Sequence, residues 1–324
     1  MDLIGSLNDA KEKVLQEFET QNKNFYLFYN ELLDLLLKQK REGPIGGEEK
    51  YSNLVKEFTI HRNKEVFKIL TTALIESIPK EKSKGKLWLP ETVASFIMDI
   101  IEELKLKNTN VLLPLYSFVM SSQMSQKENY NMITGYEVNR RFYTIVQKIY
   151  QLCELNNLKL VPRSFIKEDE IKGVDLIFSL IPFMKKKIEI NNIPELKNSG
   201  LPRNINYTSA YILKSINHLQ DKGYAIYMVP VGILRNERYQ PIREYLIDNY
   251  RILSVIELPK GIFTNSAIKM SLLIIQNTQP KPENVLLASF EKEDFNKEKA
   301  DYLKNFKKHL KKGIYNENNT KNTR

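Results

Sequence analysis

The chain has 324 residues, and 42% of them are hydrophobic, a share typical of a globular protein with a buried core. Its single cysteine, Cys153, excludes an intrachain disulfide framework and favours a reducing compartment. The first residues have neither the basic nor the apolar region of a signal peptide, and no apolar run reaches the length of a membrane span. We therefore expect a cytoplasmic protein without a membrane partner.

The 49 lysines and arginines outnumber the 39 aspartates and glutamates, which gives a net charge of +10. Such an excess favours a polyanionic partner such as DNA. The lysines are spread along the whole chain, so a solvated basic surface explains the charge equally well. Both interpretations stay open at this point.

Residues 1–80 are predicted to form a helical accessory domain. Its clearest helix places apolar side chains three and four positions apart, on one face: Phe25, Phe28, Tyr29, Leu32, Leu33, Leu36 and Leu37. A glycine-rich break follows at 41–47, and a further helix at 64–77 ends before Pro79. Such a domain serves target recognition, dimerisation or packing support for the next domain. We favour packing support.

Residues 84–290 are predicted to form an α/β domain, because apolar strands alternate with amphipathic helices. Expected helices cover 91–104 and 139–155. Two strands are expected at 111–115 and 158–165. A further strand is expected to end at 134–138, and another occupies 175–183 together with the turn that follows it. Pro90 suits the first position of a helix, where its missing N–H costs nothing. Cys153 falls at helical spacing among apolar residues, so we assign it to the core.

The second half continues this alternation. A helix at 211–219 is expected to end at Gly223 as a left-handed cap, followed by a strand at 225–229. Pro241 opens another helix, and two buried strands follow: 253–258 and 271–275. Near-continuous apolar strands predict a sheet covered by helices on both faces. A last strand at 285–288, a helix at 302–310 and a disordered tail from Lys311 complete the chain, with 291–324 as its C-terminal segment.

This second half resembles the C-terminal half of the catalytic domain of adenine-specific DNA methyltransferases of the type I modification-subunit kind. The resemblance lies in GYAIYMVP at 223–230, the helix and strand ending in LP at 241–259, GIF at 261–263 and KMSLLIIQ at 269–276. Over nearly its full length the chain is similar to the YtxK family of methyltransferase-like proteins. The resemblance implies a Rossmann-like class I methyltransferase sheet with an N-terminal helical domain, the cofactor S-adenosylmethionine (SAM), and DNA as the substrate.

The resemblance also implies cofactor-binding positions. Leu89 and Pro90 match a Thr-Pro element that the family has near the methionine end of SAM, and Leu89 lacks the hydroxyl. Glu137 stands in place of the acid that binds the cofactor ribose, and Ser164 lies near the residue that holds its adenine. Leu113 and Ser117 stand where the family has an acid and a G-x-G turn. Glycines there let the backbone approach the cofactor closely, whereas both residues here carry side chains.

The catalytic motif position falls at Leu180, Pro182 and Phe183. Adenine methyltransferases have N-P-P-F/Y or D-P-P-Y here, because the Asn or Asp accepts a hydrogen bond from the target amine and the aromatic ring stacks on the flipped base. Leu180 offers no acceptor, and an unpaired polar group in a closed site costs roughly 1–3 kcal/mol. Pro182 and Phe183 match the motif.

A polar loop follows the motif and carries Lys185, Lys186, Lys187 and Arg203, which are candidate contacts for nucleic-acid phosphates. A solvated loop is the simpler interpretation. For the whole chain three functions are considered: an active adenine-N6 DNA methyltransferase, a pseudo-methyltransferase that binds nucleic acid or acts as a scaffold, and an interaction subunit of an intact methyltransferase. Homo-oligomerisation also stays open. Departures at both the cofactor loop and the catalytic position favour the pseudo-methyltransferase.

Overall fold

A computed structural model describes residues 3–21, 24–43, 51–58, 60–77, 88–167, 171, 173–181, 184, 186–197, 199–263, 267–279 and 285–321. The chain divides into two compact units. Unit 1 comprises Met1–Lys86 and Phe118–Ser164, and unit 2 comprises Leu87–Ser117 and Phe165–Arg324. Residues 118–164, which the sequence groups with the α/β domain, therefore cluster with the N-terminal helices.

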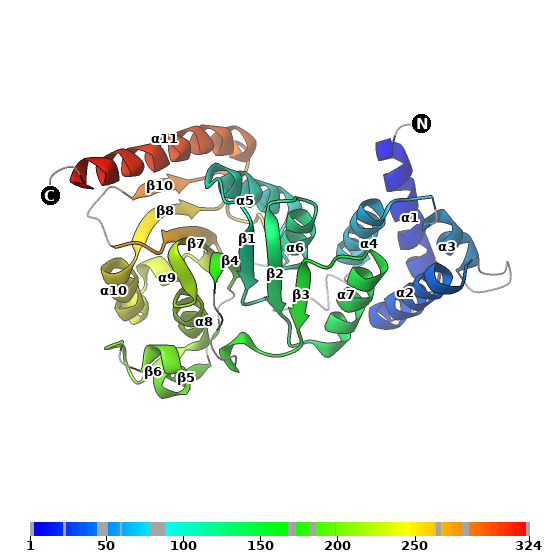
Figure 1. The fold of residues 1–324 in the computed structure, drawn as a ribbon, viewed down its shortest axis with the longest axis horizontal. Helices are drawn as coiled ribbons and strands as arrows, with labels where there is room; N and C mark the ends of the chain where they lie inside the picture. Colours follow the sequence, from blue (N-terminus) through cyan, green and yellow to red (C-terminus); the bar gives the residue numbers. More distant parts are fainter. Residues whose placement is uncertain are drawn as a thin grey trace. The chain divides into compact units, whose positions relative to one another are not determined.

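Unit 1 is built mainly from helices, as predicted for its first 80 residues (Figure 1). The helices are α1 Leu3–Gln21, α2 Phe25–Glu42, α3 Ser52–Phe58, α4 Asn63–Ser77, α6 Phe118–Ser125 and α7 Arg140–Leu152. All seven apolar residues predicted for the inner face of α2 are buried. Asn24 begins α2 by accepting a hydrogen bond from the Tyr26 amide, and Lys148 on α7 reaches across to Asn30 at 2.9 Å.

Two parallel strands complete unit 1, β2 Tyr130–Tyr136 and β3 Leu158–Val161. The second strand of the pair is shorter than the predicted 158–165. Pro162 follows it directly and has no amide to donate to a neighbouring strand, so the strand ends at Val161.

Unit 2 contains a large, mostly parallel sheet, which confirms the predicted α/β class. Its strands are β1 Thr109–Leu113, β4 Val174–Leu180, β7 Leu219–Pro230, β8 Arg251–Glu257, β9 Met270–Gln276 and β10 Leu286–Ser289. They neighbour one another in the order β10-β8-β9-β7-β4-β1. The strand β9 runs antiparallel to both neighbours, and the other pairs in this set are parallel.

Helices cover both faces of this sheet (Figure 1). They are α5 Glu91–Glu103, α8 Tyr207–Ile216, α9 Gly232–Arg235, α10 Gln240–Asn249 and α11 Phe295–Lys321. Short 3₁₀ turns η1 Phe165–Lys167, η2 Ile190–Asn192, η3 Pro194–Leu196 and η4 Glu237–Tyr239 lie between them. On one face Ser254 bonds Tyr302 of α11 at 2.9 Å, and on the other Tyr227 bonds Ser215 of α8 at 2.7 Å. The two bonds lie on opposite faces of the sheet. Tyr227 and Val255 both pair with Leu273, so their side chains share one face, and Ser254, one residue before Val255, points to the other face.

The boundary between α8 and β7 differs from the prediction. The helix ends at Ile216, and β7 already begins at Leu219, so Gly223 lies inside a strand and does not cap a helix. The positive φ belongs to Lys222, at 63°. A Cβ on Gly223 would lie 3.0 Å from the Gln220 carbonyl oxygen and 3.1 Å from that of Asp175. The glycine is therefore needed for close backbone approach at an irregularity in the β4–β7 pairing.

Three further expectations need correction. Pro90 precedes the first residue of α5 and acts as its N-cap, with φ −62° and ψ 142°. The predicted polar loop after β4 contains a small antiparallel pair, β5 Lys187–Glu189 and β6 Asn204–Asn206. The last helix extends beyond 302–310 to Lys321, so the tail expected to be disordered from Lys311 is helical through that residue. No helix in the described part of the chain is long and apolar enough to cross a membrane.

Candidate functional site

The carboxyl end of β4 carries the expected catalytic position. Leu180 is the last residue of the strand, pairs with Met228 of β7 and is only 8% exposed. The next residue, Ile181, donates its amide hydrogen to the Met228 carbonyl at 2.9 Å. The position that the resemblance assigns to an acceptor side chain therefore holds a buried aliphatic one. Pro182, Phe183 and Lys185 lie outside the described residues.

The segment from β1 to α6 is where the family has its glycine turn. Leu113 ends β1 and is fully buried, and Ser117, at 8% exposed, is the last residue before α6. Residues 113–117 contain no glycine, and none of them has a positive φ. The backbone here adopts angles that any L-residue tolerates, and a side chain stands at each position. The connection therefore lacks the open cradle that glycines provide.

At the start of α5, Pro90 serves the helix itself. Its carbonyl oxygen accepts hydrogen bonds from the amides of Val93 and Ala94, at 3.1 and 2.9 Å. The helix has no side-chain cap, and the preceding Leu89 is buried. The hydroxyl of the family's Thr-Pro element has no counterpart in these two residues.

In unit 1, Glu137 directly follows β2 and is buried. Its amide donates to the Val161 carbonyl at 3.0 Å, and its Oε1 accepts the Asn139 amide at 2.8 Å. Asn139 in turn caps α7. The acid expected to bind a ribose thus stabilises the turn that begins α7. Ser164, predicted near the cofactor adenine, lies half-buried shortly after β3.

Unit 2 also contains a hollow of about 450 Å³ beside the short β5–β6 hairpin, here called the hairpin hollow. It is lined by Met184, Lys187, Pro202, Asn204, Ile205, Asn206, Ser209, Arg238, Tyr239, Pro241 and Ile242. Asn206 accepts hydrogen bonds from the amide and hydroxyl of Ser209, both at 2.9 Å, and thereby begins α8. The Met184 amide donates to Thr208 Oγ1 at 2.9 Å, which fixes the segment after β4 to the same helix.

Two cationic side chains line the hairpin hollow, Lys187 and Arg238. The Arg238 guanidinium lies 4.8 Å from the centre of the Tyr239 ring, a favourable cation–π distance. Burial raises the pKa of the Tyr239 phenol, and the neighbouring Arg238 charge partly opposes that rise. The phenol therefore stays neutral, and the net charge of the lining is positive.

The predicted phosphate contacts separate in the structure. Lys186 holds its ammonium 5.3 Å from the centre of the Tyr207 ring, next to Lys187. Arg203 stands at the other end of the hairpin, where it is exposed and pairs with Glu189 at 3.4 Å. Sequence reasoning missed Arg238, which lies over fifty residues beyond the motif and reaches the hollow only through the fold.

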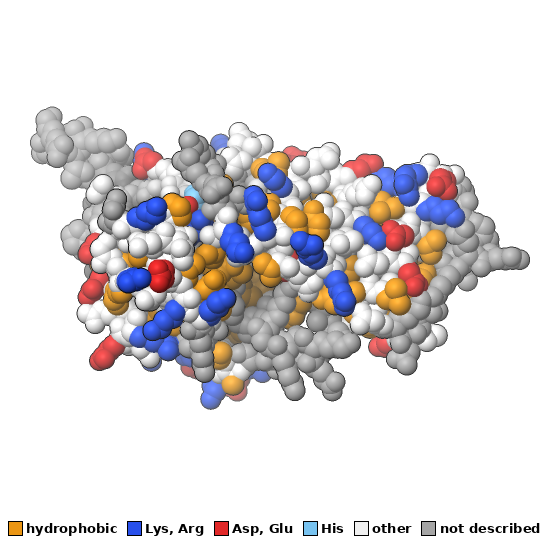
Figure 2. Space-filling view, turned by 90° about the horizontal axis from the view of Figure 1, so that it is seen from below, with side chains coloured by type: hydrophobic (Ala, Val, Ile, Leu, Met, Phe, Trp, Pro, Cys, Tyr) orange, Lys and Arg blue, Asp and Glu red, His pale blue; other side chains and the backbone are white. Residues whose placement is uncertain are grey.

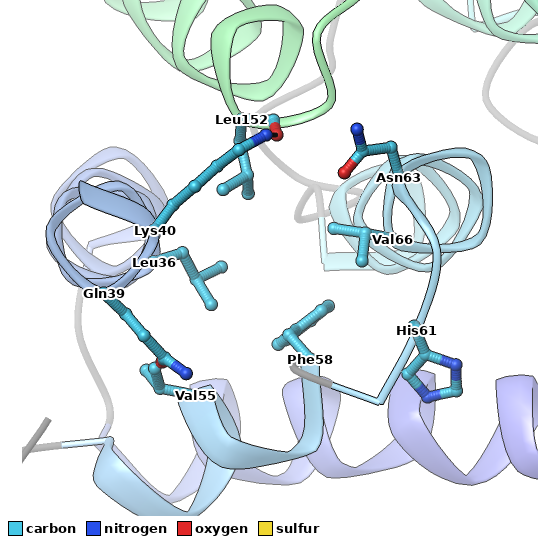
Figure 3. A pocket seen from close by; sticks show the side chains of 9 residues that line it. All are labelled: Leu36, Gln39, Lys40, Val55, Phe58, His61, Asn63, Val66 and Leu152. Carbon is cyan, nitrogen blue, oxygen red and sulfur yellow. Dashed lines mark hydrogen bonds between the residues drawn. The ribbon is translucent and has the colours of Figure 1, made fainter. Parts of the chain in front are cut away.

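Unit 1 has a smaller hollow of about 280 Å³, which no sequence pattern indicated (Figure 3). It is lined by Leu36, Gln39, Lys40, Val55, Phe58, His61, Asn63, Val66 and Leu152. Lys40 donates to the Leu152 carbonyl at 2.6 Å and pairs with Glu154 at 2.8 Å. Its charge is therefore compensated by Glu154, and the other lining residues are apolar side chains together with Gln39, His61 and Asn63. Within the described residues no cluster of His, Cys, Asp and Glu could hold a metal.

A sequence profile of the N-6 DNA Methylase family matches residues 73–322, which is most of the chain. The chain belongs to the N-6 DNA methylase family. The methylase subunit of the type I restriction enzyme MpnII from Mycoplasma pneumoniae is 21% identical to this family member over 233 residues. That match covers 63% of the chain and 42% of the relative, so the chain spans less than half the length of this curated relative.

Solved structures show the fold of this N-6 DNA methylase family member. A putative class I SAM-dependent methyltransferase from Listeria monocytogenes superposes with a TM-score of 0.72 at 18% identity, covering 93% of the chain and 99% of its own. The methyltransferase subunit of a type I restriction-modification system from Streptococcus thermophilus gives 0.62 at 18% identity, covering 80% and 61%. Both likenesses confirm the predicted class I methyltransferase fold.

Proposed function

We propose that this N-6 DNA methylase family member is a methyltransferase-like protein that binds nucleic acid without transferring methyl groups. The proposal is supported by two differences from the family's sequence pattern, both within unit 2. The segment from Leu113 to Ser117 has no glycine and no unusual backbone angle. Leu180 is a buried aliphatic residue at the position of the amine acceptor.

The residues present do not fit SAM in the binding mode of the family. A side chain at each position from Leu113 to Ser117 keeps the backbone from approaching a cofactor closely. Glu137 fits by residue type, but its Oε1 already accepts the Asn139 amide. No methyl-transfer step is therefore assigned to the chain.

Positive charge supports binding to nucleic acid. The chain carries a net charge of +10, and Figure 2 shows Lys and Arg side chains distributed across the drawn face, together with Asp and Glu side chains. The hairpin hollow offers a candidate phosphate site, since Lys187 and Arg238 line it together with residues at the beginning of α8. Helix N-termini and cations both attract phosphates. The family acts on DNA, so duplex DNA is the nucleic acid to test first.

The test measures binding of a fluorescent DNA duplex by anisotropy across salt concentrations. The double variant Lys187→Gln/Arg238→Gln is compared with Arg203→Gln, whose charge is already paired with Glu189. We expect the log–log salt slope of the double variant to be shallower by up to about 2, at roughly 0.9 per phosphate contact. The Arg203 control should keep the wild-type slope within about 0.5. Affinity of the wild type that does not change with salt would contradict electrostatic binding.

A further inference from the structure

Among its described side chains, those up to residue 311, the helix α11 packs on unit 2 by one face. Its inner residues Phe295, Tyr302 and Phe306 are buried. Phe295 and Tyr302 contact the ring of Phe96 on α5, with centroids 5.8 and 5.7 Å apart, and Tyr302 also bonds Ser254 of β8 at 2.9 Å. These contacts set the rotation of the helix about its axis. They therefore determine which residues face the solvent.

The outer face of α11 carries four exposed lysines, here called the lysine row: Lys297, Lys304, Lys308 and Lys311. Their spacings of seven, four and three residues place them on one stripe of the helix. At 1.5 Å per residue the row extends over roughly 20 Å. The only acid on the stripe among the described side chains is Asp301.

The lysine row has no ion pair with a described residue, in contrast to Lys307 on its flank, which pairs with Glu103 at 3.2 Å. Between residues 295 and 311 the helix carries six lysines against two acids. Like charges along one helix face repel one another and destabilise the helix slightly. A polyanion placed along the row would remove that repulsion and release its own counterions.

The burial of the apolar face of α11 distinguishes between two polyanionic partners, a lipid surface and duplex DNA. A basic helix that lies on a lipid surface inserts apolar side chains into it, but here Phe295, Tyr302 and Phe306 are committed to the protein core. The buried apolar side chains of this helix face the core, and the lysine row itself presents hydrated ammonium groups. Duplex DNA suits them, because it presents one negative charge per roughly 1.7 Å of its axis. A row of about 20 Å therefore meets enough phosphates for every lysine.

We propose that the lysine row of α11 contacts the phosphate backbone of duplex DNA. The proposal rests on the proposed nucleic-acid binding and adds to it a surface outside the hairpin hollow. Each lysine contributes a point charge without base recognition, so the contact is independent of DNA sequence.

The experiment compares three forms of the full-length chain: the wild type, a row variant with the four lysines of the lysine row changed to Gln, and a matched control. The control changes Lys64, Lys68, Lys107 and Lys159 to Gln, four exposed lysines on other elements. Both variants lower the net charge by four, from +10 to +6. Anisotropy of a labelled duplex of random sequence is measured from about 50 to 200 mM salt, with unfolding midpoints to verify folding.

The row variant is expected to show a salt slope shallower by about 3 to 4, from roughly 0.9 per lost phosphate contact. The control should differ from the wild type by less than about 1. A row variant with the wild-type slope, or one no shallower than the control, overturns the inference while leaving the proposed function in place. A wild type that fails to bind the duplex overturns both. Wild-type binding to anionic phosphatidylserine vesicles without duplex binding also overturns both and identifies a membrane surface instead.

Discussion

At the scale of single residues, Cys153 carries a thiol whose surroundings keep it unreactive. It follows α7 and is 3% exposed. Burial raises the pKa of the thiol to about 12, although the charge of Lys40 opposes the shift. Because the thiolate is the reactive form, the folded protein keeps this cysteine inert at neutral pH.

This arrangement predicts a pH dependence with a definite sign. The unfolded thiol ionises near pH 8.5, whereas the folded one stays protonated to about pH 12. Its contribution to stability is therefore complete below about pH 8.5 and is lost as the pH rises from there towards 12. Against Cys153→Ala, the wild type should lose roughly 1.4 kcal/mol more unfolding free energy per pH unit in that range. Urea titrations at several pH values measure this difference.

A thiol reagent gives the matching check at pH 8. We expect native Cys153 to react only as fast as the protein opens, and to react at once in urea. Labelling of the native protein at the rate of a free thiol would contradict the burial argument and restore Cys153 as a candidate nucleophile.

Only some of the positions of the candidate-site residues could be predicted from the sequence. The position of Leu180 follows from the order of elements, because the end of the fourth strand is fixed by an apolar run. The local use of Glu137 does not follow, since its bond to the Asn139 amide depends on the turn geometry after β2. Arg238 reaches the hairpin hollow only because η4 packs near the hairpin. No local pattern records such a contact.

At the scale of elements, the long apolar strands could be located from the sequence. Strands that are short, or that contain polar residues at an irregularity, could not. The strands β8 and β9 lie within two residues of the predicted ranges, because each contains a largely apolar run that the sequence shows directly. The start of β7 was missed, since its polar residues 220–222 lie at an irregularity, between the β4 pairings of Leu219 with Val174 and of Tyr224 with Leu176. The three-residue strands β5 and β6 are too short to leave a periodic signal.

The irregularity in β7 gives a prediction about Gly223. A Cβ at this position would lie about 3 Å from two backbone oxygens, which cannot move as a side chain can. We expect Gly223→Ala to lower the unfolding free energy by roughly 1–3 kcal/mol through overpacking. Urea unfolding at neutral pH is the measurement.

Gly232 supplies the matched control for that experiment. It is the first residue of α9, and a Cβ there would meet no atom within 4 Å. Gly232→Ala should be neutral or stabilise by up to about 1 kcal/mol, since Ala favours helices. Equal effects of the two substitutions would show that close approach at Gly223 is not what selects glycine there.

At the scale of the whole molecule, the chain combines an intact methyltransferase fold with a site that departs from the family's chemistry. The likeness to the putative class I SAM-dependent methyltransferase from Listeria monocytogenes extends over 93% of the chain. The departures concentrate at Leu180 and at 113–117, at the carboxyl ends of β4 and β1. The chain has a net charge of +10, and Lys and Arg side chains are distributed over the face drawn in Figure 2. The proposed function follows from this combination of a methyltransferase fold, a positive net charge and an aliphatic residue at the position that the resemblance assigns to the amine acceptor.

Titration of the purified full-length chain with SAM by isothermal calorimetry tests this claim most directly. The duplex-binding assay on the same preparation verifies that the protein is folded and active in binding. We expect no saturable binding heat with SAM up to millimolar concentration. Stoichiometric binding with a micromolar dissociation constant would contradict it, because the segment from Leu113 to Ser117 would then accommodate the cofactor despite its side chains.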